Sequence, residues 1–220
     1  MTGGELLFAP DYSGGDFVAP LQISGHGFLG APALTNLWGG KAAVVAMCDV
    51  AIAGGVTLTA DSGMFVGTNA TLALASAVTG TGVLSVKGPG TLAIAAPISC
   101  TGGVVIDAGA VEIRPGSSGV LTLPASAVPD GATLVVTGSG VPDGCGTLVV
   151  DGDVDLSRLN VRFGPKSSFA GTTYTIIRAT GTVSGALDDA TLPSAKWHYE
   201  YSGNEVLAVR KVTGMVIGFK

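Results

Sequence analysis

The sequence predicts an all-β protein, and the expected architecture is a right-handed parallel β-helix, a form of β-solenoid. Three observations carry this prediction: short apolar runs alternate with polar residues, Gly or Pro separates the runs, and a Thr-Leu pair returns along the chain. Hydrophobic residues make up 47% of the chain, which is enough for a core, and the 35 glycines suit frequent turns. We therefore expect strands and turns, and no helix.

The alternation is clearest between Gly80 and Ile113. Four short runs there place apolar side chains at every second position, which is typical of half-buried strands. The polar positions between them are Ser85, Lys87, Thr91, Asp107, Glu112 and Arg114. The apolar residues expected to share one side, facing the core, are Leu84, Val86, Leu92, Ile94, Val104, Ile106, Val111 and Ile113.

Residues 1–35 are less regular and are expected to form N-terminal strands or a first coil. Prolines at positions 10, 20 and 32 suit edge strands or loops better than central strands. We expect strands at 5–9 and 17–24 in this region. Further short strands are expected at 42–47, 50–53, 56–60, 64–66 and 71–75.

Thr-Leu pairs begin, among other places, at positions 57, 71, 91, 133 and 147. The interval from 91 to 133 contains the strand expected at 110–113, so it corresponds to two repeats. Self-similarity at about 20 residues is typical of a solenoid, in which each unit buries its apolar face against copies of itself. We assign the coils of the β-helix to residues 36–168.

An antiparallel β-sandwich is the alternative fold. Sandwich strands usually recur every 8–12 residues and are joined by hairpin turns. Asp-Gly turn signals occur here at Asp130, Asp143 and Asp151. The longer repeat of the Thr-Leu pair favours the solenoid.

Residues 169–220 differ from the rest and are expected to form a C-terminal capping module, because a solenoid needs an atypical end to seal its core. Closing strands are expected at 206–209 and 215–219. Alternation places Trp197, Tyr199 and Tyr201 on one side of a strand, where they would fill the core in preference to binding a sugar. Aromatic residues gather in this region at Phe169, Tyr174, Trp197, Tyr199 and Tyr201.

The stretch Gly80–Ile113 resembles the autotransporter-associated β-strand repeat, and Phe169–Val209 resembles the module that ends such passenger regions. The resemblance implies an exported, surface-displayed or secreted bacterial β-helix. The chain after Val209 is too short for the membrane β-barrel of autotransporters, so we expect either an excised passenger fragment or another anchor. The matching positions are Gly80-Thr81-Gly82, Leu84, Lys87, Gly88, Gly90-Thr91-Leu92, Ile94, Thr101-Gly102-Gly103, Val105, Ala108-Gly109 and Ile113.

Composition excludes several classes of partner. The net charge is −5, the isoelectric point is near 4.8, and no Lys/Arg cluster could follow a phosphate backbone, so nucleic acid is excluded. The same charge disfavours an anionic membrane surface, and no run of about 20 apolar residues predicts insertion into a membrane. Cys48, Cys100 and Cys145 lack metal-binding spacing and are expected to be buried in strands.

Asp151, Asp153 and Asp155 form the one candidate metal site. They alternate, so a strand would project all three from one face, and their oxygens could bind Ca²⁺. The alternatives are a solvated turn or neutralisation by Arg158 and Arg162. No other cofactor is expected, and we assign no catalytic or cofactor-binding residue.

Other motifs carry weaker expectations. Gly25–Gly30 matches a dinucleotide-binding pattern, with Asp49 at the place of its acidic residue, but Pro32 denies the helix that such a site requires. Asp188 and Asp189 fit a solvated loop better than a glycosidase pair. His26 and His198 lie at opposite ends of the chain, so no Ser-His-Asp triad is predicted.

The leading functional hypothesis is a non-enzymatic stalk, adhesive passenger or display scaffold of an exported bacterial surface protein, secreted or associated with the outer membrane. One alternative is a carbohydrate-active β-helix, a lyase or hydrolase that uses Asp151, Asp153 and Asp155. Another is a self-assembling surface component. The expected partners are host or cell-surface glycans or proteins, together with further copies of the chain.

Overall fold

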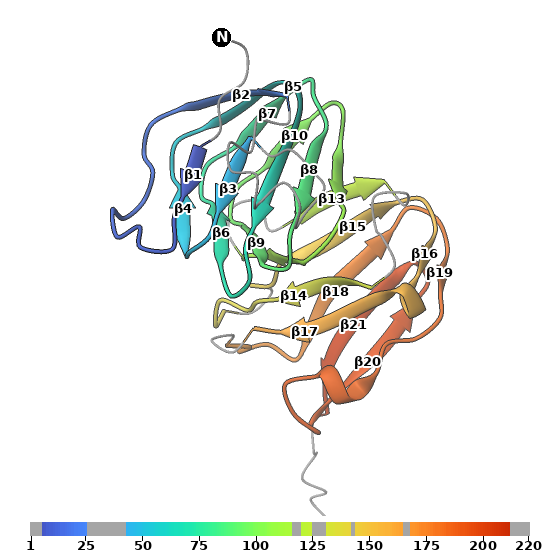
Figure 1. Cartoon of the computed structure of the whole chain (residues 1–220). Helices are drawn as coiled ribbons and strands as arrows, with labels where there is room; N and C mark the ends of the chain where they lie inside the picture. The colour runs from blue at the N-terminus through green and yellow to red at the C-terminus, as the bar shows by residue number, and fades with distance from the viewer. Residues whose placement is uncertain are drawn as a thin grey trace, which may run out of the picture.

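The computed structural model describes residues 6–25, 43–115, 120–124, 131–141, 144–164 and 168–211. These residues form strands, turns and two short 3-10 helices, and none of them lies in an α-helix. Figure 1 shows the strands stacked side by side, with β1 toward one end of the stack and β20 and β21 at the other. The all-β prediction is confirmed.

The strands are short and follow one another closely along the chain. Their bounds are β1 Leu6–Phe8, β2 Leu21–Gly25, β3 Val44–Ala46, β4 Val50–Ile52, β5 Val56–Val66, β6 Thr71–Leu74, β7 Val78–Gly80, β8 Leu84–Lys87, β9 Thr91–Ile94, β10 Ile98–Cys100, β11 Val104–Ile106, β12 Ala110–Ile113, β13 Val120–Pro124, β14 Ala132–Val136, β15 Thr147–Asp151, β16 Val154–Asp155, β17 Leu159–Phe163, β18 Thr173–Ala179, β19 Val183–Ser184, β20 Trp197–Ser202 and β21 Glu205–Arg210; the 3-10 helices are η2 Leu156–Arg158 and η3 Asp189–Thr191.

From β3 to β9, three strands make one layer, and each strand pairs in parallel with its equivalent in the next layer. In the layer β6, β7 and β8, Leu72 pairs with Leu92, Val78 with Ile98, and Leu84 with Val104. The step along the chain is the same on each face, so all three faces repeat together. The repeat length predicted from the sequence is confirmed for these layers.

The pairing gives an eight-stranded, a six-stranded, a five-stranded and a two-stranded sheet. The six-stranded sheet, β4-β6-β9-β12-β14-β17, is parallel throughout. Among the named strands of the described residues, antiparallel ladders join only β21 to β18 and β20. Parallel sheets are the opposite of what an antiparallel β-sandwich requires, so that alternative is wrong.

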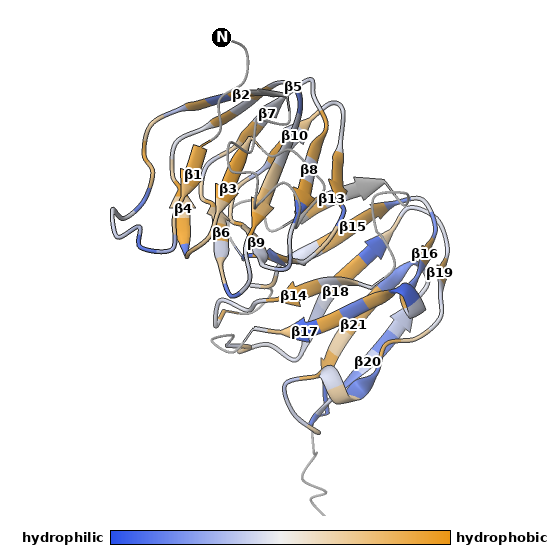
Figure 2. Ribbon diagram, viewed as in Figure 1, coloured by the Kyte–Doolittle hydropathy of each residue, from blue (hydrophilic) through white to orange (hydrophobic). Residues whose placement is uncertain are grey.

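The core lies inside the stack and is built from columns of aliphatic side chains. All eight residues predicted to face inward between Gly80 and Ile113 are buried, and Leu72, Leu92 and Val111 form part of one column. Stacking residues of similar size removes apolar surface from water in each layer. This burial stabilises the fold by about 25 cal/mol for each Å² of apolar surface. Figure 2 shows hydrophobic strands through the first layers and more hydrophilic ones at β17 and β20.

β5 differs from the prediction, because it is one strand of 11 residues and not two. Val56–Leu58 pairs with β7, whereas Ser62–Phe65 pairs with β8, so the strand passes around a corner of the layer. At the corner, the Ser62 hydroxyl donates to the Ala60 carbonyl and the Asp61 carboxylate accepts from the Val83 N–H. These bonds satisfy backbone groups at the bend and keep the chain extended.

Aromatic side chains lie near the two ends of the stack. The chain has no Phe, Trp or Tyr between Phe65 and Phe163. At the first layer, the Phe8 ring packs edge-on against Tyr12 and Phe17. At the other end, Phe169 packs edge-on against Phe163, Tyr174 and Trp197. Large rings fit these ends because no further layer has to stack directly on them.

The C-terminal end closes by reversing strand direction. β21 runs antiparallel to β18, and β20 pairs with the other side of β21. On the outer edge of β20, the Asp189 carboxylate of η3 accepts from the Tyr199 N–H at 3.2 Å. A side chain placed there blocks the addition of another strand. The closing strand expected at 215–219 lies outside the described residues.

A deletion of one full layer tests the stacking. Removing residues 71–90 places Thr91, Ile98 and Val104 where Thr71, Val78 and Leu84 stood, since the step between these partners is the same on all three faces. We expect a cooperatively unfolding β protein of lower stability, because a layer array shortens without changing its register. The measurement is circular dichroism during thermal unfolding.

The control is removal of residues 71–80, which deletes part of a layer and puts the following strands on the wrong faces. That variant should be unfolded. A folded 71–80 deletion together with an unfolded 71–90 deletion would contradict the stacking.

A pair of glycine substitutions tests how closely the layers approach. Gly109 and Gly103 both have φ of +88°, but a Cβ at Gly109 would overlap the Gly88 carbonyl oxygen of the layer below, whereas a Cβ at Gly103 meets nothing within 4 Å. Gly103→Ala should cost about 1–2 kcal/mol from the backbone conformation alone. Gly109→Ala should cost about 1–3 kcal/mol more. Urea unfolding measures both, and equal costs would contradict the close contact.

Candidate functional site

Asp151, Asp153 and Asp155 lie at the corner where β15 passes into β16, and all three are exposed. The Asp151 carboxylate accepts from the Thr180 hydroxyl at 2.9 Å. The Asp153 carboxylate accepts from both the N–H and the hydroxyl of Thr182, at 2.7 and 2.9 Å. Thr180 and Thr182 belong to the next layer, so these two aspartates join neighbouring layers.

Asp155 bonds within its own turn. It is the N-cap of η2, and its carboxylate accepts from the N–H and the hydroxyl of Ser157 at 3.0 and 2.7 Å. Hydrogen bonds from Ser157, with a smaller contribution from the charge of Arg158, hold the pKa of Asp155 below its usual value. The other arginine considered at this site, Arg162, donates to the Thr91 hydroxyl at 3.5 Å.

The described residues contain no group of three or more His, Cys, Asp or Glu side chains placed to hold a metal ion. The carboxylates of Asp151, Asp153 and Asp155 are instead held by hydroxyl and N–H donors on Thr180, Thr182 and Ser157. Calcium at these aspartates stays a prediction, and the geometry gives it no support.

The same use of aspartate recurs at other corners, which the sequence did not predict. The Asp49 carboxylate accepts from the Thr71 N–H and the Asp61 carboxylate accepts from the Val83 N–H, both at 2.8 Å and both 22 residues along the chain. One signal in the sequence could have indicated these bonds, because each aspartate lies about one repeat before the backbone group that it binds. Side chains at the corners therefore satisfy backbone groups that face the adjacent layer.

Asp188 and Asp189 act as structural side chains of η3. Asp188 is its N-cap and accepts from the Ala190 N–H at 2.9 Å, while Asp189 accepts from Tyr199. His198 lies 2.8 Å from the Glu200 carboxylate through Nε2, and its buried Nδ1 has no hydrogen-bond partner among the described residues. The structure brings neither aspartate to His198 as part of a triad.

The three aromatic residues of β20 divide between core and surface. Trp197 and Tyr199 are buried, at 6% and 8% exposure, as predicted, but Tyr201 is 46% exposed, so its placement in the core was wrong. The Tyr201 hydroxyl accepts from the Leu187 N–H at 2.9 Å, which holds it over the loop before η3. Burial raises the pKa of Tyr199 to about 12, and its hydroxyl lies 2.8 Å from that of Thr191.

The three cysteines are free thiols and only partly buried, which corrects the expectation of full burial. Burial is nevertheless the main cause that raises the pKa of each thiol, to about 12 for Cys145. Residues 26–30 of the dinucleotide-like motif, including His26, lie outside the described residues, as does Pro32. Gly25 ends β2, and Asp49 binds Thr71.

The comparisons with known proteins identify no relative. No family model, no curated protein and no solved structure matches the chain. Among the described residues, no helix is long and apolar enough to cross a membrane.

The link between Asp153 and Thr182 gives a prediction for acid. Hydrogen bonds from Thr182 hold the pKa of Asp153 below its usual 3.8, so its contribution to stability is present above that pH and is lost as the pH falls through the lowered pKa. Asp153→Asn should lower the midpoint of urea unfolding at pH 7, and the difference from wild type should shrink at pH 2.5.

Asp16→Asn, at an exposed position in the loop before β2, is the control and should leave the midpoint unchanged at both pH values. A difference for Asp153→Asn that is as large at pH 2.5 as at pH 7 would show that the ionised carboxylate is not the stabilising group.

Proposed function

We propose that the chain is a right-handed parallel β-helix in which residues 36–168 form the coils and residues 169–220 form the cap. Parallel pairing of three successive faces at one common step supports the coils. The reversed strands β20 and β21, with Asp189 over the outer edge, support the cap.

As a function, we propose a non-enzymatic stalk or display scaffold of an exported bacterial surface protein. The observation that carries this proposal is that the polar corner side chains bind the neighbouring layer. Asp49, Asp61 and Asp153 each accept from a backbone N–H one layer along. Such bonds tie successive layers together, which suits an element that must hold its length and not turn over a substrate.

The resemblance to autotransporter-associated repeats supports export and surface display. Several of its positions have structural roles that repeat between layers. Gly80, Gly88, Gly103 and Gly109 all have positive φ, at corners that follow strands or connect them. Lys87 pairs with Asp107 of the next layer at 3.6 Å, and this exposed pair adds little stability but follows the same repeat.

A display experiment tests the function. The chain is fused at its C-terminus to a bacterial outer-membrane anchor and carries an epitope at its N-terminus. Antibody binding to intact cells should be strong for wild type and for the 71–90 deletion, because both keep whole layers. It should be lost for the 71–80 deletion, whose unfolded chain is exposed to proteases.

An assay of polysaccharide turnover tests the enzymatic alternative. Purified wild type and the triple variant Asp151→Asn, Asp153→Asn, Asp155→Asn are compared on a panel of bacterial and host polysaccharides, after circular dichroism confirms that both are folded. We expect no turnover by either protein. Turnover by wild type that the triple variant loses, or absence of the wild-type epitope from the cell surface, would contradict the proposal.

A further inference from the structure

From β3 onward, the number of residues between paired positions in successive layers rises at β12. Thr91 pairs with Ala110, a slightly shorter step than that of the layers before it, and Ala110 pairs with Thr133, a slightly longer one. Beyond this level the steps lengthen further, since Ala132 pairs with Leu159 and Leu148 with Ile177. From β3 onward, longer layers therefore follow shorter ones, and the strands turn to a new direction at the same place (Figure 1).

Among the described residues, the face that carries β11 is interrupted at this level. β10 and β11 are the last strands of the eight-stranded sheet, and β13 is the first strand of the five-stranded sheet. Within the described residues no ladder joins β11 to β13. Among the described residues, the six-stranded sheet continues across this level, through the pairing of Ala110–Ile113 with Thr133–Val136.

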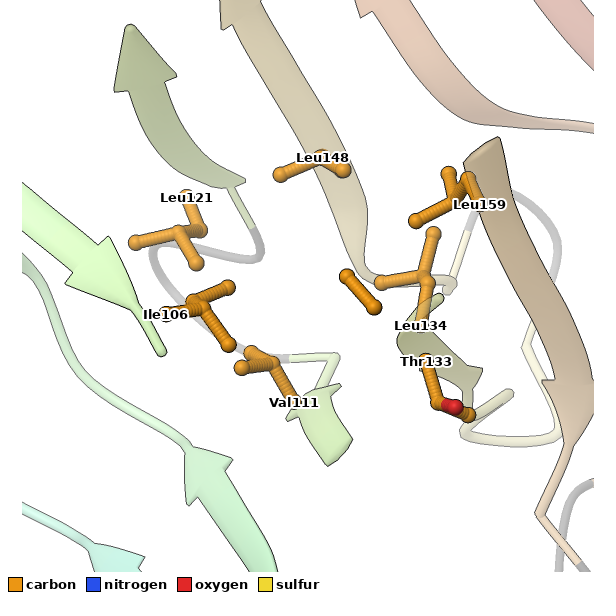
Figure 3. Close-up of a pocket in the computed structure, with 8 residues that line it drawn as sticks. Ile106, Val111, Leu121, Thr133, Leu134, Leu148 and Leu159 are labelled. Atoms are coloured by element: carbon orange, nitrogen blue, oxygen red, sulfur yellow. The ribbon is translucent and has the colours of Figure 1, made fainter. Parts of the chain in front are cut away.

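An apolar cavity lies at the interruption. The space between its lining side chains is small and partly open to solvent. Ile106 and Val111 line it from the shorter layers, whereas Leu121, Leu148 and Leu159 line it from the longer ones. Figure 3 shows Leu121 beside Ile106 and Val111, with Leu134 and Leu159 on the opposite side. Side chains that face a gap lose the dispersion contacts that a filled core would supply.

The side chains that line the cavity offer few hydrogen-bond partners to water. A buried water needs two to four polar partners, and Thr133 carries the one side-chain hydroxyl among the described residues that line the cavity. Among the described residues, this level is thus joined by the ladder of β12 with β14, has no ladder between β11 and β13, and contains the cavity. Both defects fall at the same position.

We propose that this level is a joint at which the molecule opens as two cooperative units, one reaching from β1 to β12 and the other from β13 to β21. Each unit keeps its own ladders and buried columns, so each can open while the other stays folded. Tension along the stack, or added denaturant, separates the two units at the cavity before it unfolds either unit. The proposal does not depend on the display function.

Native-state hydrogen exchange of the full chain in increasing urea tests the joint. We expect the amides of β5–β9 to share one opening transition and those of β15–β21 to share another, with different dependence on urea. A single transition common to both sets would overturn the proposal.

A matched pair of variants tests the cavity. Val111 and Val86 are both 2% exposed, but only Val111 lines the cavity. Val111→Ile adds a methylene at the cavity. It should raise the protection of backbone amides against exchange in the less stable unit about fourfold, and so bring the opening transitions of the two units closer together. Val86→Ile adds the same group to a filled column and should lower protection in its own unit. Equal loss of protection in both variants would overturn the joint.

Discussion

The register between successive layers is the constraint on which the structure depends. Backbone hydrogen bonds in each ladder run to the layer before and the layer after, so a residue such as Leu92 is fixed by Leu72 on one side and Val111 on the other. A change of register in one face would have to be matched in the other two. In the layer β6, β7 and β8, equal steps on all three faces satisfy this requirement.

The glycines and aspartates of the corners follow from this constraint. Layers lie about 4.8 Å apart, which leaves no room for a side chain where two corners meet. Gly109 packs there against the Gly88 carbonyl. Where a corner has room, Asp61 or Asp153 uses it to bind an N–H of the next layer. The corners therefore stabilise the stack, as the side-chain columns do inside it.

Much of the fold could be predicted from the sequence, because burial alternates with a period of two. Leu84, Val86 and Leu92 face the core as that pattern indicates. The pattern failed where tertiary contacts decide the outcome. β5 stays extended through Asp61 because of a bond to Val83 in the next layer, and Tyr201 is held outward by the Leu187 N–H. Neither partner is visible in a local window of sequence.

The sequence indicated which aspartates belong to the candidate site, but not how they are arranged in space. Alternation of Asp151, Asp153 and Asp155 indicated one shared face, but Gly152, with φ of +122°, breaks the strand between the first two. The threonines that bind Asp151 and Asp153 come from a layer 29 residues further on, well beyond the repeat length that the sequence indicated. The repeat of the Thr-Leu pair did not indicate that these layers are longer.

Nuclear magnetic resonance of the isotopically labelled protein tests the central claim most directly, since it detects which strands are neighbours. Parallel stacking predicts cross-strand backbone contacts between β6 and β9 that keep a constant difference in residue number, from Thr71 with Thr91 to Leu74 with Ile94. Contacts in which one residue number rises as the other falls would indicate antiparallel pairing and would contradict the stacked array.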